Sequence, residues 1–139
     1  MPTEAHFVFD TNVIVSALLL KRSVARQAFN KALDQGKLLL SLATLEELND
    51  VLRRDSFDKY ISEDERLEFL AALVREAILV EIAETISECR DPKDNKFLEL
   101  AISGNAAYIV SGDDDLLVLD PFRGIPILAP RPFLEKETV

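Results

Sequence analysis

The sequence predicts an α/β protein: a three-layer α/β/α sandwich in which a parallel five-stranded sheet lies between two layers of helices. Short apolar runs alternate along the chain with longer segments of helical periodicity. Strands that are separated by helices require right-handed crossovers within a parallel sheet that is covered on both faces. Of the 139 residues, 48% are hydrophobic, which is enough for one sizeable core, so we expect a single domain over residues 1–139.

The expected strands are short, apolar and buried. Residues 6–9 are apolar and aromatic, and the strand that they predict ends at Asp10. The last strand contains Pro126, which cannot donate to a ladder, so we expect it at an edge of the sheet. The strands are expected at residues 6–9, 38–40, 78–82, 107–110 and 125–128.

The expected helices are marked by their boundary residues. Gly36 follows the second helix as its stop, Ser62 with Glu65 forms the Ser-x-x-Glu capping pattern, and Pro92 stands at a first helical position. The helices are expected at residues 13–20, 23–35, 44–54 and 62–77, from Asp91–Pro92 through Ile102, and in a short segment around Leu116.

Charge and residue counts exclude several classes of site. The net charge of −9 argues against a broad basic face for nucleic acid, although bound divalent cations would reverse the local field at an acidic site. His6 and Cys89 are the only residues of their kinds, which excludes disulfides and paired-histidine or cysteine-rich zinc sites. We expect a structural role for His6 and a buried position for Cys89.

The sequence also predicts a soluble, cytoplasmic protein with no membrane association. Its longest apolar stretch, residues 13–20, is far shorter than the roughly 20 residues that a membrane helix needs. The first five residues are acidic rather than basic and lead directly into a strand, which argues against a secretory signal.

Acidic residues gather at one edge of the expected sheet. Asp10 and Asp113 follow strands, while Glu47 and Asp94 stand in the first turns of helices. Because ligands bind at the carboxyl ends of parallel strands, these side chains are expected to share one pocket. Carboxylates raise each other's pKa unless a cation lies among them, and oxygen ligands without histidine or thiol select Mg²⁺ or Mn²⁺.

Each acid also has a purely structural explanation. Asp10 could cap the following helix, and Glu47 could form a capping box with Thr44. Asp94 could interact with a helix dipole, and the Asp113–Asp115 segment could be a turn that caps the next helix. The coincidence of all four at one edge of a sheet favours the metal site.

Two longer motifs resemble the PIN domain. They are Phe-Asp-Thr-Asn-Val after the first strand, and Asp-Pro-Lys-Asp-Asn followed by Ser-Gly-Asp-Asp-Asp-Leu-Leu. The resemblance extends from Phe7 to about Pro130 and is closest to the PIN toxins of bacterial toxin–antitoxin systems. It implies a PIN-like fold and a Mg²⁺- or Mn²⁺-dependent endoribonuclease, with RNA as substrate, an antitoxin protein as partner and a possible homodimer.

The resemblance also assigns roles to individual residues. It implies that Asp10, Glu47, Asp94 and Asp113 are the catalytic, metal-binding acids, with Glu47 a better match than Glu46. The polar residues beside them would support the site or contact substrate: Thr11, Asn12, Ser111 and Asp115. Asp115 could replace or assist Asp113, and Asp91 is expected to be a cap or a partner that orients the other acids. The sequence leaves open whether one ion or two are bound.

Three other functions compete with this interpretation. A phosphatase of the haloacid-dehalogenase type needs a second aspartate where this chain has Asn12, and a phospho-receiver domain needs a lysine near residues 128–130, which are Leu-Ala-Pro. The stronger alternative is a catalytically weak PIN-fold module that binds RNA or protein.

Overall fold

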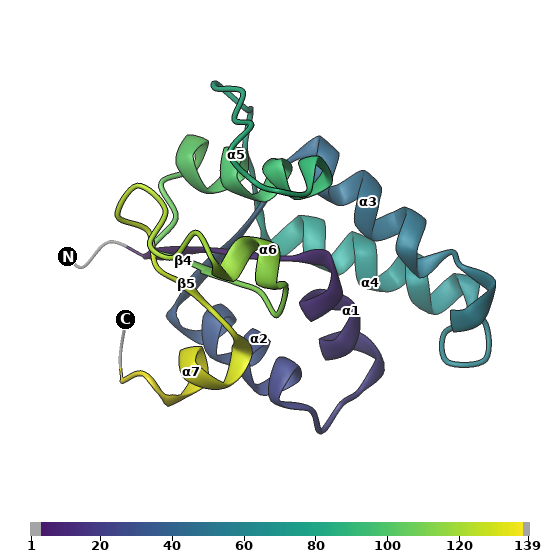
Figure 1. Cartoon of the computed structure of the whole chain (residues 1–139). Coiled ribbons are helices and arrows are strands. Elements are labelled where there is room, and N and C mark those ends of the chain that lie inside the picture. The colour runs from purple at the N-terminus through teal and green to yellow at the C-terminus, as the bar shows by residue number, and fades with distance from the viewer. Residues whose placement is uncertain (1–3, 138–139) are drawn as a thin grey trace.

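The chain forms a central sheet with helices packed on both of its faces (Figure 1). The computed structural model describes residues 4–137, so the two ends of the expected domain, residues 1–3 and 138–139, lie outside the described part. The strands are β1 (Ala5–Phe9), β2 (Gly36–Leu40), β3 (Ile78–Leu79), β4 (Tyr108–Val110) and β5 (Ile127–Leu128). The α-helices are α1 (Thr11–Leu19), α2 (Val24–Gln35), α3 (Leu42–Leu52), α4 (Glu63–Glu76), α5 (Asn95–Ser103), α6 (Asp114–Leu117) and α7 (Pro130–Glu135), and the 3-10 helices are η1 (Asp55–Phe57) and η2 (Pro92–Asp94).

Over residues 4–137, five parallel strands follow the order β3-β2-β1-β4-β5, which confirms the predicted fold class and the edge position of the last strand. Phe7 pairs with Leu38 on one side and with Tyr108 on the other, so β1 is the central strand. The chain builds outward from β1 to β3 and then returns to place β4 on the opposite side. The carboxyl ends of β1 and β4 therefore flank a topological switch point, where ligands of such sheets bind.

Alternating residues of the strands divide the core between the two faces of the sheet. Phe7 and Phe9 belong to a buried cluster with residues of α1, α2, α3 and α7, whereas Val8, Leu39 and Ile109 belong to a second cluster with residues of α5 and α6. This arrangement follows from the period of two along a strand and gives the three layers. None of the helices within residues 4–137 is long and apolar enough to cross a membrane.

The third strand is shorter than predicted: it ends at Leu79, and Val80 N makes one further hydrogen bond to β2, to Leu40 O at 2.8 Å. The following segment lies against α5, and side chains of that helix bind its backbone N–H groups. Ala83 N donates to Ser103 Oγ at 3.0 Å, Ile86 N to Glu99 Oε2 at 2.9 Å, and Cys89 N to Asn95 Oδ1 at 2.9 Å. Polar groups of α5 thus bind backbone N–H groups beyond Val80, where the predicted strand does not continue.

Gly36 ends α2, as predicted, and also begins β2: its backbone N–H donates to Ala32 O as the C-cap of the helix. Its φ of 176° is extended backbone that any residue can adopt. A Cβ atom at this position would lie 1.9 Å from the carbonyl oxygen of Ala5 on the paired strand. The requirement for glycine here is therefore the close approach of β1 and β2.

Candidate active site

The side chain of Asp10 joins the end of β1 to the start of α1. It is only 5% exposed and caps α1, accepting a hydrogen bond from Val13 N to Oδ1 at 2.9 Å. Its Oδ2 accepts a hydrogen bond from Ser111 Oγ. Burial raises the pKa of Asp10, the Ser111 and Val13 hydrogen bonds oppose this, and the negative charges of Asp113 and Glu47 raise it further. Asp10 is therefore both the predicted cap and a member of an acidic group.

Ser111 connects Asp10 to the next acidic turn. It is fully buried, and its backbone N–H donates at 3.0 Å to the carbonyl oxygen of Leu128, a residue of β5. Its hydroxyl group donates to Asp10 and accepts from Asp113 N at 3.0 Å. One hydroxyl thus fixes the position of the turn after β4 relative to the end of β1.

Asp113 and Asp115 lie on either side of the start of α6. Asp113 is the N-cap, and its Oδ1 accepts from Asp115 N at 2.9 Å, as the turn interpretation predicts. Asp115 Oδ1 is 2.9 Å from Arg90 Nη2 in an ion pair whose two side chains are both partly exposed. The two aspartates therefore hold different positions, one within the turn and the other toward the segment that precedes η2.

Asp94 lies at the junction between η2 and α5 and, unlike Asp10 and Asp113, makes no capping hydrogen bond. Its Oδ2 is buried and has no hydrogen-bond partner among residues 4–137. The pKa of Asp94 is raised to about 7. Burial is the largest cause, a hydrogen bond with Asp113 is the next, and the negative charges of Asp113, Asp91 and Glu47 add to them. A half-buried carboxyl group among other acids resists ionisation in this way when no cation is present.

Glu47 reaches the same site from α3. Its Oε2 is 3.0 Å from Lys96 Nζ, and both side chains are about three quarters buried. The expected first-turn position of Glu47 is wrong: α3 begins at Leu42, its capping box joins Ser41 to Thr44, and Glu47 stands in the second turn. The structural explanation that paired Glu47 with Thr44 is therefore wrong too.

The structure separates Glu46 from Glu47. Glu46 is exposed and lines an apolar groove between α3 and α4, whereas the charge of Glu47 raises the pKa values of Asp10 and Asp94.

The polar residues that follow Asp10 also differ in position. Thr11 is buried in the first turn of α1, and exposed Asn12 lines a hollow of about 360 Å³ beside Asp10 and Asp113.

Carboxylate oxygens of Asp91, Asp94 and Asp115 approach one another within 4.8 Å, which is close enough for one cation to contact all three. Asp91 had been expected as a cap or orienting partner, and it does accept from Lys93 N at 3.1 Å. The feature of the sequence that could have indicated this place among the possible ligands is the spacing of three residues between Asp91 and Asp94. With Asp10, Glu47 and Asp113, these residues form what we call the acidic cluster.

The acidic cluster fits a hard divalent cation. Its donors are carboxylate oxygens, and the unpartnered Oδ2 of Asp94 supplies a buried ligand atom with no other bond among the described residues. The four acids that the sequence singled out act on one another electrostatically, and Asp91 and Asp115 add the closest oxygen atoms. The N-termini of α1, α5 and α6 meet here, at one end of the sheet (Figure 1).

The two residues for which structural roles are expected, Cys89 and His6, each make a contact with a backbone oxygen. Cys89 is 7% exposed, and its thiol donates to the backbone oxygen of Asp115 at 3.4 Å. Burial raises the pKa of this thiol, and the nearby acids Asp94, Asp115 and Asp113 add to the effect. His6 Nδ1 is 2.9 Å from Gly104 O, near the amino end of β1 and away from Asp10.

Comparisons with known proteins support the fold. The chain is 29% identical over 115 residues to "Uncharacterized protein MJ1680" of Methanocaldococcus jannaschii, covering 81% of this chain and 73% of that protein. Two solved structures share the fold. A chain of VapBC2 from Rickettsia felis, which was crystallised bound to a DNA fragment from the promoter, has a TM-score of 0.54 at 15% identity over 88% of this chain and 96% of that one. PAE2754 from Pyrobaculum aerophilum has a TM-score of 0.57 at 13% identity over 94% of this chain and 88% of that one.

A family model gives the assignment. The model described as "PIN domain" matches residues 6–115, a span that runs from β1 to the start of α6 and contains every member of the acidic cluster. Since this match covers most of the chain, the protein belongs to the PIN domain family.

Proposed function

We propose that this protein is a Mg²⁺- or Mn²⁺-dependent endoribonuclease that hydrolyses phosphodiester bonds of single-stranded RNA. The observation that carries the proposal is Asp94, whose buried Oδ2 has no hydrogen-bond partner among the described residues and lies among four other acids: Asp91, Asp113, Asp115 and Glu47. An acidic site with no histidine in reach leaves few other ways to activate water at neutral pH. When bound, a divalent cation supplies a Lewis acid that lowers the pKa of water and neutralises phosphate charge.

The residues divide into groups with different tasks. Asp91, Asp94 and Asp115 would hold a cation, because their oxygen atoms are the closest set. Asp10 and Asp113, whose carboxyl groups are fixed by backbone N–H groups, would border the same space and receive the attacking water or a second cation. Loss of the Asp94 proton is required before this residue can act as a ligand, so binding of the cation and release of that proton are coupled.

Ser111 and Lys96 would act on the acids rather than on the substrate. The Ser111 hydroxyl holds Asp10 in one orientation and keeps one of its oxygens hydrogen-bonded. The Lys96 ammonium group offsets the charge of Glu47, which lowers repulsion within the cluster before a cation binds. Single strands are the preferred substrate because a chain with a net charge of −9 offers little basic surface to grip a duplex.

We also propose that the protein is the toxin of a toxin–antitoxin pair that acts in the cytoplasm. The likeness in fold to a chain of VapBC2 from Rickettsia felis supports this proposal. An antitoxin protein would then be its partner, and a homodimer is part of the same proposal. The alternative remains a PIN-fold module that binds RNA or protein and cleaves weakly. The full set of acids favours the enzyme.

The test is cleavage of a mixed single-stranded RNA pool by the purified protein in MgCl₂, MnCl₂ or EDTA. We expect cleavage with either metal, none in EDTA, and a loss of at least about 100-fold in Asp94→Asn, since metal-site ligands carry most of such a rate. Asp114→Asn is the matched control, because Asp114 is an exposed acid of the same turn that lies outside the acidic cluster. Cleavage that persists in EDTA, or that is equal in Asp94→Asn, would contradict the proposal.

A further inference from the structure

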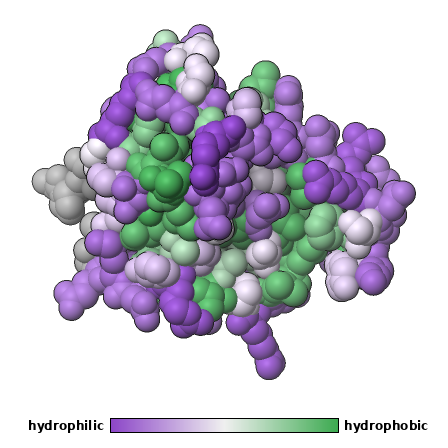
Figure 2. All heavy atoms as spheres, viewed as in Figure 1, coloured by the Kyte–Doolittle hydropathy of each residue, from purple (hydrophilic) through white to green (hydrophobic). Residues whose placement is uncertain are grey.

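A second hollow adjoins the one that contains Asp10 and Asp113. It has a volume of about 380 Å³, and α1 and the following residue supply one wall through Val15, Ser16, Leu19 and Leu20. The opposite wall is the loop between α3 and α4, through Phe57 and Tyr60. Figure 2 shows this apolar surface between α1 and that loop, toward the right of the view, with hydrophilic surface around it. We call it the aromatic hollow.

The aromatic hollow shares two lining residues with the hollow that contains Asp10 and Asp113. Asn12 and Ser16 line both spaces, so one surface of α1 leads from the acids to the aromatic residues. Asn12 is exposed, and its amide group can both donate and accept hydrogen bonds along this path. A chain molecule whose reacting bond lies at the acids would pass over Asn12 and reach Tyr60.

Tyr60 is exposed but stands on an anchored loop. Its side chain is 61% exposed, while the next residue, Ile61, is only 7% exposed and fixes the loop to the body of the protein. Tyr60 N donates to Phe57 O at 2.9 Å, so the two aromatic residues belong to one closed turn. Packing in the hydrophobic core therefore does not explain the exposed position of this large aromatic ring.

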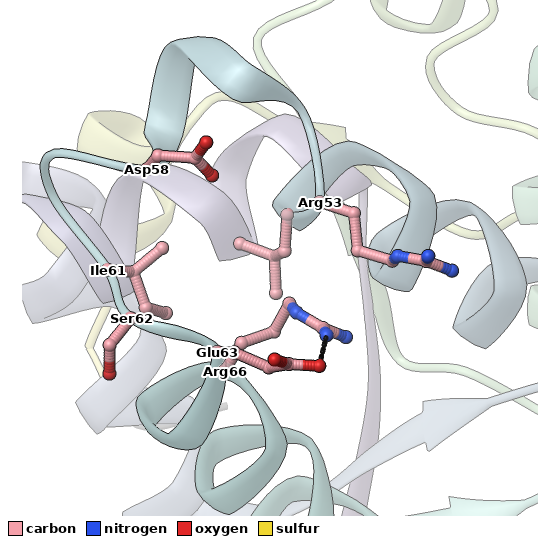
Figure 3. A pocket seen from close by; sticks show the side chains of 7 residues that line it. Arg53, Asp58, Ile61, Ser62, Glu63 and Arg66 are labelled. Carbon is pink, nitrogen blue, oxygen red and sulfur yellow. Dashed lines mark ion pairs between the residues drawn. The ribbon is translucent and has the colours of Figure 1, made fainter.

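Arg66 joins the two helices that flank this loop. Its Nη1 donates to Asn49 Oδ1 at 2.7 Å, and its Nη2 is 3.6 Å from Glu63, although only 11% of the side chain is exposed. Figure 3 shows this ion pair together with Ile61 and Asp58 around the polar pocket under the loop. The loop that carries Tyr60 is therefore bounded by two helices that Arg66 holds together and by the buried Ile61.

Positive charge lies next to this exposed ring in a protein that is acidic overall. Lys59 Nζ is 5.2 Å from the centroid of the Tyr60 ring. Lys21 follows Leu20, which lines the hollow, and its charge acts on Glu65 in the first turn of α4. A cation beside an exposed aromatic ring suits a nucleotide, because the ring stacks on the base and the cation attracts the phosphate.

We propose that the aromatic hollow binds a base of the single-stranded RNA substrate, with the base stacked on Tyr60 and an adjacent phosphate attracted by Lys59. The inference rests on the proposed function, because the acids define where the scissile phosphate lies. RNA is favoured over a protein segment or a second copy since the path is lined by Asn12 and Ser16 and begins at the acidic cluster. A stacked base also explains a preference for single strands, whose bases are free to leave the stack.

The experiment measures binding of a single-stranded RNA oligonucleotide that contains 2-aminopurine, in EDTA and low salt. Stacking quenches 2-aminopurine fluorescence, so the signal reports the base itself. We expect Tyr60→Ala to raise Kd about tenfold and to abolish the quenching, since one base–aromatic stack accounts for about 1–3 kcal/mol. Tyr60→Phe keeps the ring and should retain both. Leu42→Ala is the control, because Leu42 is a 71% exposed apolar residue that lines the groove between α3 and α4 instead.

The outcomes separate this inference from the proposed function. Equal affinity and equal quenching in Tyr60→Ala and the unsubstituted protein would overturn the inference, as would an absence of binding by the unsubstituted protein. A change of oligomeric state in Tyr60→Ala, measured by light scattering, would assign the hollow to a second copy and would also overturn it. Metal-dependent cleavage that is indifferent to Tyr60 refutes only the stacking site, and Tyr60-dependent binding without any cleavage refutes only the nuclease.

Discussion

Replacing Asp94 by asparagine should stabilise the metal-free protein at neutral pH. The pKa of Asp94 is raised from its ordinary value of 3.8 to about 7, first by burial and then by Asp113 and the other acids. A carboxyl group with a raised pKa contributes stability that is fully present below about pH 4 and is lost as pH rises through about 7. Asparagine keeps the shape of the side chain and carries no charge, so it avoids that loss.

The magnitude follows from the size of the shift. A difference of about three between the folded and unfolded pKa values corresponds to an upper bound of about 4 kcal/mol. Water reaches much of the cluster and screens the carboxylates from one another, so we expect about 1–2 kcal/mol. For a chain of this length, such a change corresponds to a rise of roughly 5 °C in Tm.

The assay is thermal unfolding of both proteins in EDTA between pH 5 and 8. The stability advantage of Asp94→Asn should grow as pH rises toward 7 and level off above it. Saturating MgCl₂ should then reverse the order at pH 8, because a cation that binds only the folded state raises the Tm of the unsubstituted protein by mass action. Asp114→Asn should show neither effect. A variant that is less stable at pH 8 in EDTA, or a difference that does not change with pH, would refute the reasoning.

Three further predictions test other parts of the structure. Asp10→Ala should lower the free energy of unfolding by about 2–3 kcal/mol, whereas Asp10→Asn should lower it by less than about 1 kcal/mol. The reason is that asparagine can still accept a hydrogen bond from Val13 N. Equal losses in urea denaturation would show that the cap is unimportant. Glu47→Gln should reduce the rise in Tm on addition of MgCl₂ while Glu46→Gln leaves it unchanged, and the opposite order in thermal unfolding would exchange their roles. Gly36→Ala should cost about 2 kcal/mol or more in urea denaturation, since its Cβ would meet a strand backbone at 1.9 Å, and a neutral result would mean that β1 and β2 can separate without loss.

Local signals in the sequence were sufficient for the fold class and for most elements. Each expected strand forms at least in part, because apolar runs flanked by helices have few alternatives to a buried parallel sheet. The start of α3 differs from the prediction because a second capping residue lies closer to the preceding strand than Thr44 does. Ser41 lies directly after β2 and caps α3, so the helix begins two residues before Thr44.

Other features could not be predicted because they depend on contacts between distant residues. The polar side chains of Ser103, Glu99 and Asn95 carry no local sign that they bind the segment after β3. The ion pair of Glu47 with Lys96 joins residues that are far apart in sequence. Similarly, the meeting of Asp91 with Asp115 requires two loops to adopt their final positions.

The structural and chemical explanations of the acids can now be weighed residue by residue. Asp10 and Asp113 do cap helices, so their presence is explained by stability as well as by a metal site. Asp94 differs, because it makes no capping bond and leaves Oδ2 buried without a partner among the described residues. Its raised pKa means that its ionised form destabilises the metal-free fold at neutral pH. A residue that lowers stability and has no local structural task is best explained by a chemical one, and it is the position where metal binding and folding can be separated by a single substitution.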